Sequence, residues 1–103
     1  MAWTLLCIAG LLEIAFALAM KSSMGFTRLW PSLLTVASGV SSVWMLSLAL
    51  RTLPVGTGYA VWTGIGAAGT AVLGMLVLGD AVAPVRIACI TLILAGVVGL
   101  RLA

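Results

Sequence analysis

The sequence has very little charge. Of its 103 residues 7% are charged and 64% are hydrophobic, and the mean hydropathy is +1.36. A soluble domain typically carries about 25% charged residues, so this chain could not cover a surface that faces water. We therefore predict an integral membrane protein. The net charge of +3 is small and spread along the chain, which argues against a nucleic-acid partner.

Histidine is absent and cysteine is scarce, which excludes much site chemistry. The two cysteines, Cys7 and Cys89, stand far apart inside apolar segments, where free cysteine behaves as a small hydrophobe. Without histidine or a cysteine pair at ligand spacing, the sequence implies no metal site. No pairing of a nucleophile with a base is visible either. We predict that the protein is not an enzyme and needs no cofactor.

Acidic residues are almost missing, and one of the two is unusually placed. Glu13 lies inside an apolar segment, whereas Asp80 follows a glycine between two such segments. An ionisable group within a membrane span is costly and indicates function by default. The alternative is a permanently protonated Glu13 bonded to a neighbour. We favour function, because burial and a second carboxylate nearby would let this group hold a proton at one time and a cation at another.

Four long apolar runs cover nearly the whole chain, at about 3–20, 32–50, 56–78 and 85–100. A spanning helix needs roughly 20 residues, and a helix satisfies its own backbone groups in lipid. The sequence therefore predicts an all-α membrane protein, with residues 1–103 forming a single four-helix domain. We expect the first run to be retained rather than removed as a signal peptide, because no basic segment precedes it and Glu13 interrupts it.

Basic residues are nearly balanced between the two sides of the membrane. With four spans, Arg51 and Arg101 share one side, while Lys21, Arg28 and Arg86 share the other. Such a weak bias predicts insertion in both orientations, although a single weakly favoured orientation is the alternative. Four helices alone would also surround a site poorly. Two antiparallel copies would provide eight helices and two facing carboxylates, a recurrent transporter design.

Polar and aromatic side chains are few in the second apolar run. Ser38 and Ser42 are four residues apart and share a helix face. Their hydroxyls could reach a carboxylate or a substrate, or could bond to the carbonyl four residues earlier, as serine often does in apolar helices. Trp44 could line a cavity or face lipid. The sequence leaves both questions open.

The third run has the richest polar face, formed by Tyr59, Trp62, Thr63 and Gly66 at helical spacing. Aromatic faces attract cations, and the Tyr O–H and Trp N–H can orient a carboxylate. We favour a cavity role for Tyr59 and Trp62 over a belt at the membrane interface. Further glycines in this run indicate either close helix packing or a kink.

Small residues also occur beside Glu13 and in the last run. Ala9, Gly10 and Ala17 share a helix face with the carboxylate and leave space beside it. Gly96 and Gly99 form a small-residue patch, which predicts helix pairing within or between subunits.

The chain resembles the small multidrug resistance family over essentially its whole length. The lone Glu13 in the first of four spans and the run LPVGTGYAVWTGIG at 53–66 carry the resemblance. Within the family, the loop from Lys21 to Arg28 and the run Trp62-Thr63-Gly64 are similar to the guanidinium exporter subtype. The drug-exporting subtype usually has serine where Thr63 stands.

This resemblance implies an antiparallel homodimer in the bacterial inner membrane that exchanges protons for guanidinium-type cations. Glu13 would be the shared proton and substrate site. The resemblance also implies that Ser42, Tyr59 and Trp62 hold the carboxylate or line the pocket, with Gly10 beside it and Thr63 in the same motif. Some relatives work as paired heterodimers, but the balanced charge favours a homodimer.

One position departs from the pattern of this subtype. Phe16 stands where the guanidinium exporters typically have tryptophan, so a ring N–H near Glu13 is missing. Broader export of quaternary ammonium and other drug cations is therefore an alternative function. An accessory subunit of a membrane complex is an alternative of another class, and an ion channel is a third. The isolated Glu13 argues against a purely structural subunit, and the clustering of polar groups at one depth argues against a channel.

Overall fold

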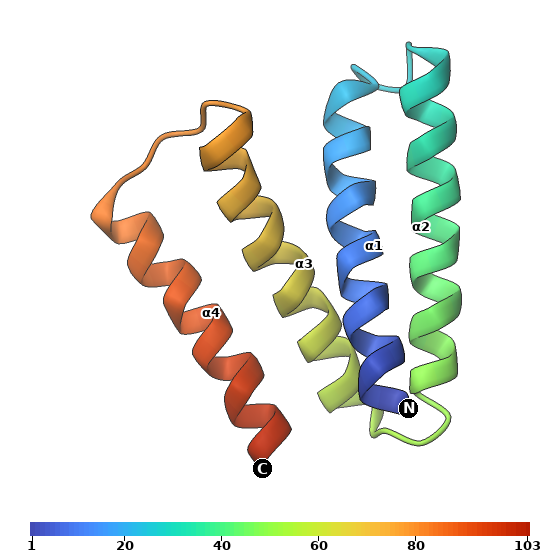
Figure 1. The fold of residues 1–103 in the computed structure, drawn as a ribbon, viewed down its shortest axis with the longest axis vertical. Helices are drawn as coiled ribbons and strands as arrows, with labels where there is room; N and C mark the ends of the chain where they lie inside the picture. Colours follow the sequence, from blue (N-terminus) through green and yellow to red (C-terminus); the bar gives the residue numbers. More distant parts are fainter.

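The computed structural model describes all 103 residues as four helices with no strand (Figure 1). The helices are α1 (Ala2–Ser22), α2 (Leu29–Ala49), α3 (Val55–Val77) and α4 (Pro84–Leu102). Each is long and apolar enough to cross a membrane. The predicted all-α fold with four membrane helices is confirmed. Relative to the expected spans, α2 begins earlier, at Leu29, because Pro31 in its first turn needs no partner for a backbone N–H.

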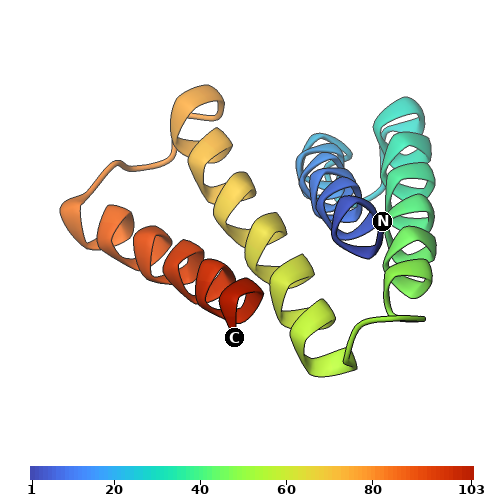
Figure 2. The same cartoon turned by 60° about the horizontal axis from the view of Figure 1, so that its bottom comes forward.

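Helix α1 packs between α2 and α3, and α4 lies beside α3 alone (Figures 1 and 2). The molecule measures 40 × 34 × 16 Å along its principal axes. A helix with its side chains is about 10–12 Å across, so a layer 16 Å deep is little more than one helix thick. One protomer therefore cannot surround a ligand on all sides.

The core of the protomer lies at one end, where α2 turns into α3. Its buried members are Leu6, Ala9, Leu46, Ala49, Val61 and Trp62. Towards the other end α3 diverges from α1, so that the two helices form a wedge (Figure 1). The wedge opens on the side that carries the α1–α2 and α3–α4 loops. Glu13 lies about midway along α1, beyond the packed end.

Helix α4 contributes no buried residue to the protomer. A Cβ added at Gly96 or Gly99 would meet nothing within 4 Å. The far end of the helix is held by Arg101, whose guanidinium carbon lies 4.6 Å from the centre of the Trp3 ring in α1. The small-residue patch predicted for helix pairing is therefore not used within the protomer. Cys7 and Cys89 are free and exposed on the protomer surface.

Candidate substrate site

The Glu13 side chain lies directly against the backbone of α3. A Cβ added at Gly66 would collide with Cγ of Glu13, so only glycine leaves room for the side chain here. The same kind of close approach occurs at Gly69, against Ile14 of α1, and at Gly64, against Val97 of α4. These three glycines thus serve close helix packing, one of the two alternatives that the sequence left open.

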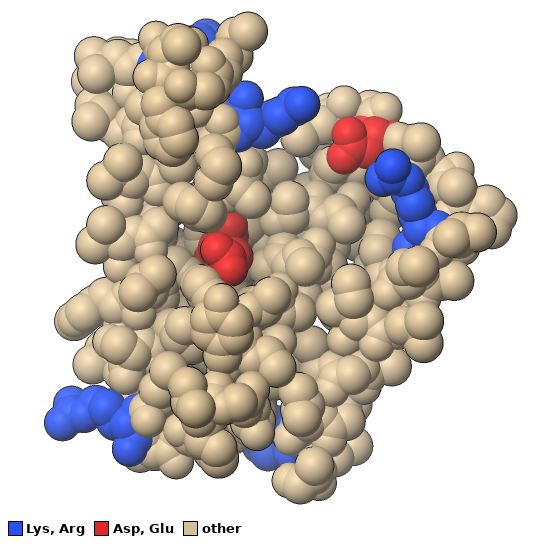
Figure 3. Space-filling view, turned by 180° about the vertical axis from the view of Figure 1, so that it is seen from behind, with Lys and Arg blue, Asp and Glu red and all other residues tan.

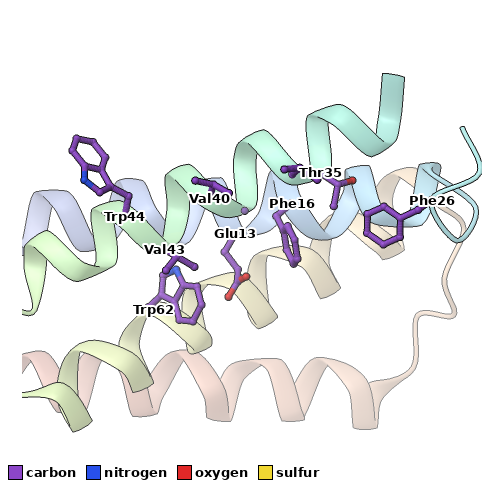
Figure 4. Close-up of a pocket in the computed structure, with 10 residues that line it drawn as sticks. Glu13, Phe16, Phe26, Thr35, Val40, Val43, Trp44 and Trp62 are labelled. Carbon is purple, nitrogen blue, oxygen red and sulfur yellow. The ribbon is translucent and has the colours of Figure 1, made fainter. Parts of the chain in front are cut away.

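Glu13 borders a cavity of about 660 Å³ between α1, α2 and α3. In Figure 4 the Glu13 carboxylate projects into this space, with Phe16 and Trp62 on either side of it. Apart from Glu13, Thr35 and Gly39, the lining is hydrophobic, and it consists of Phe16, Phe26, Val36, Val40, Val43, Trp44 and Trp62. One carboxylate among apolar and aromatic groups suits a cation that also has apolar surface.

The Phe16 ring lies on Gly39 of α2. A Cβ at residue 39 would come within 2.7 Å of Cδ1 of Phe16, so glycine at this position makes room for the ring. Phe16 follows Glu13 by three residues and therefore stands beside it on the same face of α1. Because the ring has no N–H, it forms an apolar wall and cannot donate a hydrogen bond to the carboxylate.

A hydrogen-bonded chain fixes Trp62 next to the cavity. Trp62 Nε1–H donates to the Ser42 hydroxyl over 2.9 Å, and Ser42 donates to the Ala9 carbonyl over 2.6 Å. These bonds connect α3, α2 and α1. Because the Ser42 hydroxyl donates its hydrogen to a carbonyl of α1, it does not donate to the Glu13 carboxylate. Ser38, in contrast, donates to the Leu34 carbonyl of its own helix over 2.7 Å. Of the partners that the sequence allowed for these serines, Ser38 therefore has the carbonyl four residues earlier, whereas Ser42 bonds to another helix.

The remaining predicted site residues lie further from the cavity. Tyr59 is 55% exposed and stacks at a tilt on Trp62, with ring centres 5.3 Å apart. Thr63 is exposed and faces the wedge between α1 and α3. Gly10 is buried under Ile65, where it lets α1 and α3 approach each other. Trp44, which the sequence left undecided, lines the cavity.

Several cavity residues were missed by the sequence analysis. Val36, Gly39, Val40 and Val43 line the cavity from α2, and Phe26 reaches it from the α1–α2 loop. Phe26 has a positive φ of 63°, and its N–H is held by the Ser23 hydroxyl over 3.1 Å. The spacing of the α2 residues marks one helix face. An apolar cavity wall looks like a lipid-facing surface in sequence, so this spacing was the only signal.

The comparisons with known proteins agree with one another. A family model described as Small Multidrug Resistance protein matches residues 1–93. A protein of Citrobacter freundii named "Guanidinium exporter" is 55% identical over 99% of this chain and 97% of its own length. One of Yersinia pestis with the same name is 53% identical over 100% of this chain and 99% of its own length. Given this family match and the four membrane helices, the protein is a multi-pass membrane transporter rather than an enzyme, and it belongs to the small multidrug resistance family.

Proposed function

We propose that the protein exports guanidinium-type small organic cations across the bacterial inner membrane in exchange for protons. The observation that carries this proposal is the position of Glu13, a single carboxylate that projects into an apolar and aromatic cavity. Protons and substrate compete for this group. The names of the similar proteins, guanidinium exporters at 51–55% identity, support the choice of substrate class.

The chemistry of guanidinium fits this carboxylate. A planar guanidinium presents paired N–H donors that match the two oxygens of a carboxylate. The faces of Trp62 and Phe16 beside Glu13 can stabilise the cation further. Protonation of Glu13 removes the negative charge and its capacity to accept both bonds, so proton binding releases the substrate.

The other predicted residues support this site indirectly. Ser42 fixes the Trp62 ring through its hydrogen bond, and Tyr59 packs against the same ring from the exposed side. Gly10 sets the distance between α1 and α3, and Thr63 faces the wedge near Glu13. Their role is to hold the aromatic wall and the helix spacing around the carboxylate.

The working unit is an antiparallel homodimer. A protomer 16 Å deep cannot close the cavity, whereas a second copy would cover it and bring a second Glu13. Helix α4 has no buried residue, and Gly96 and Gly99 face open space, which suits pairing with another helix. The near balance of basic residues on the two sides allows both orientations.

The test is uptake of guanidinium into liposomes that contain the purified protein, driven by a pH gradient. We expect the wild type to concentrate guanidinium and Glu13→Gln to lose coupled uptake, because glutamine can neither bind a proton nor carry a charge. Cys7→Ala, a change at an exposed position of the same helix, is the matched control. Retained proton-driven uptake in Glu13→Gln would refute the proposal.

Broader export of quaternary ammonium cations is a second candidate, and the cavity favours it. Its volume of about 660 Å³ lies within the roughly 300–1,000 Å³ of pockets for drug-sized ligands. Transport of guanidinium alone would support the narrower function and make Phe16 a tolerated variation. Transport of a bulky quaternary ammonium as well would support the broader one. Transport of neither would indicate a missing partner chain or a structural subunit.

A further inference from the structure

Glu13 borders a second hollow, which adjoins the cation cavity. This hollow of about 480 Å³ lies in the wedge between α1 and α3 and reaches the α3–α4 loop. Glu13 and Phe16 border both spaces, so the two spaces meet at these side chains. Figure 3 shows one acidic side chain at the bottom of a hollow and the other at the rim, beside a basic side chain.

The second hollow contains a buried hydroxyl without a partner. Thr70 Oγ1 is shielded from solvent and makes no hydrogen bond. The comparable hydroxyls of Thr35, Ser38 and Thr91 all donate to the carbonyl four residues earlier. A buried polar group that forgoes this bond commonly has a water molecule as its partner. Thr70 lies one turn beyond Gly66 on α3 and lines the hollow together with Glu13 and Asp80, so a water bound to its hydroxyl would lie between the rim and Glu13.

The rim of the hollow is built from the two remaining charged groups that border it. The Asp80 N–H donates to the Gly74 carbonyl over 3.0 Å, and the carboxylate of Asp80 folds back over Gly74, which has no room for a Cβ. Arg86 borders the same rim from the first turn of α4. Besides Glu13, these are the only ionisable side chains that line the hollow. Lys21 and Arg28 lie on the same side of the molecule but do not line it.

We propose that this hollow is a water-filled route for protons that meets the cation cavity at Glu13 and runs to it from Asp80 and Arg86 past Thr70. A proton enters from hydronium at the rim, passes along water and the Thr70 hydroxyl, and ends on the Glu13 carboxylate, with water left behind. This inference rests on the proposed exchange of protons for cations.

The test compares two modes of transport in Thr70→Val, which keeps the side-chain shape and removes the hydroxyl. Uptake driven by a pH gradient requires the proton route. Exchange of labelled for unlabelled guanidinium at equal pH does not. We expect the first rate to fall roughly a hundredfold, the lower end of what a positioned proton-transfer partner contributes, and the second to stay unchanged. Thr70→Ser should restore the first rate.

Equal slowing of both modes, or no slowing of either, would overturn the proton route. If Thr70→Val does not fold, Asp80→Asn decides: a loss confined to the gradient-driven mode supports the route, and wild-type rates in both modes overturn it. Failure of the wild type to exchange guanidinium for guanidinium would instead refute the proposed function, so the two failures are distinguishable.

Discussion

The position of the Glu13 carboxylate depends on a residue that has no side chain. Glu13 lies on the backbone of Gly66, and any Cβ there would push it away. Trp62 depends similarly on Ser42, whose hydroxyl connects the indole to the α1 carbonyl of Ala9. At the scale of single residues, the carboxylate and the two aromatic rings beside it, Phe16 and Trp62, are positioned by two glycines and one serine.

We predict that Gly66→Ala weakens guanidinium binding about tenfold, because displacing a packed side chain costs roughly 1–3 kcal/mol and about 1.4 kcal/mol corresponds to a factor of ten. The measurement is the Kd of guanidinium for the purified protein. Gly56→Ala is the control: it makes the same change in α3, but a Cβ there meets nothing within 4 Å. Equal affinities of the two variants would contradict this account of Glu13.

The proposed competition between protons and guanidinium at Glu13 also predicts how binding depends on pH. As the pH falls, a larger fraction of the Glu13 carboxyl groups is protonated, so the apparent Kd of guanidinium should rise. For each proton displaced, the rise approaches about tenfold per pH unit where the carboxyl is protonated, and it ceases where the carboxyl is fully ionised. Calorimetric titration across a pH series measures this slope. A Kd that is independent of pH would show that protons and substrate do not share the site.

At the scale of helices, α4 stands apart from the other three. Helices α1, α2 and α3 share a core and a hydrogen-bonded chain, whereas α4 has only α3 beside it, with one cation–π contact from Arg101 to Trp3. Gly64 allows α3 to approach Val97, but a Cβ added at Gly96 or Gly99 would meet nothing within 4 Å, because both line an unfilled hollow between α3 and α4. A helix whose small residues are unused internally is suited to bind a second copy.

Gly96→Leu should therefore disrupt the dimer without disturbing the protomer. Within one chain the new side chain enters open space, whereas in the dimer it would enter the close contact between helices of the two copies. Light scattering of the protein in detergent would show a shift towards monomer. Val98→Leu is the control, since residue 98 is exposed on the opposite side of α4. An unchanged dimer in Gly96→Leu would exclude this face as the interface.

At the scale of the whole molecule, shape and charge act together. The protomer is a layer 16 Å deep with an open cavity, and its five basic residues are divided two against three between its ends. A second copy, as proposed above, would close the site. The charge balance permits that copy to be inserted the other way up.

Removing one basic residue should shift the orientation in which the protein inserts, if the near balance of basic residues between the two ends allows both orientations. In a background of Cys7→Ala, Cys89→Ala and Thr52→Cys, we expect an impermeant thiol reagent to label roughly half of the molecules from outside the cell. Arg51→Ala leaves one basic residue against three, so residue 52 should then label almost entirely from outside. Arg28→Ala leaves two against two and should keep mixed labelling. Labelling from one side only in the starting background would contradict dual insertion.

The sequence by itself determined the number and kind of the elements and the identity of the central group. Apolar runs of about 20 residues have only one stable form in lipid, and hydropathy is a local property that each run carries alone. Glu13 was identifiable for the same reason, since a charge within such a run is conspicuous. The interaction of Trp62 with Ser42 was only one of several possibilities, because serine in an apolar helix has competing partners.

The tertiary structure decided which faces of the helices meet. Helices that are apolar all round do not reveal their rotation, so the contact of Gly66 with Glu13, the burial of Gly10 under Ile65 and the cavity wall on α2 became visible only once the helices were packed. The unpartnered hydroxyl of Thr70 likewise became visible only once the helices were packed. Its significance depends on a hollow that three separate segments enclose, and no local pattern in the chain encodes such a space.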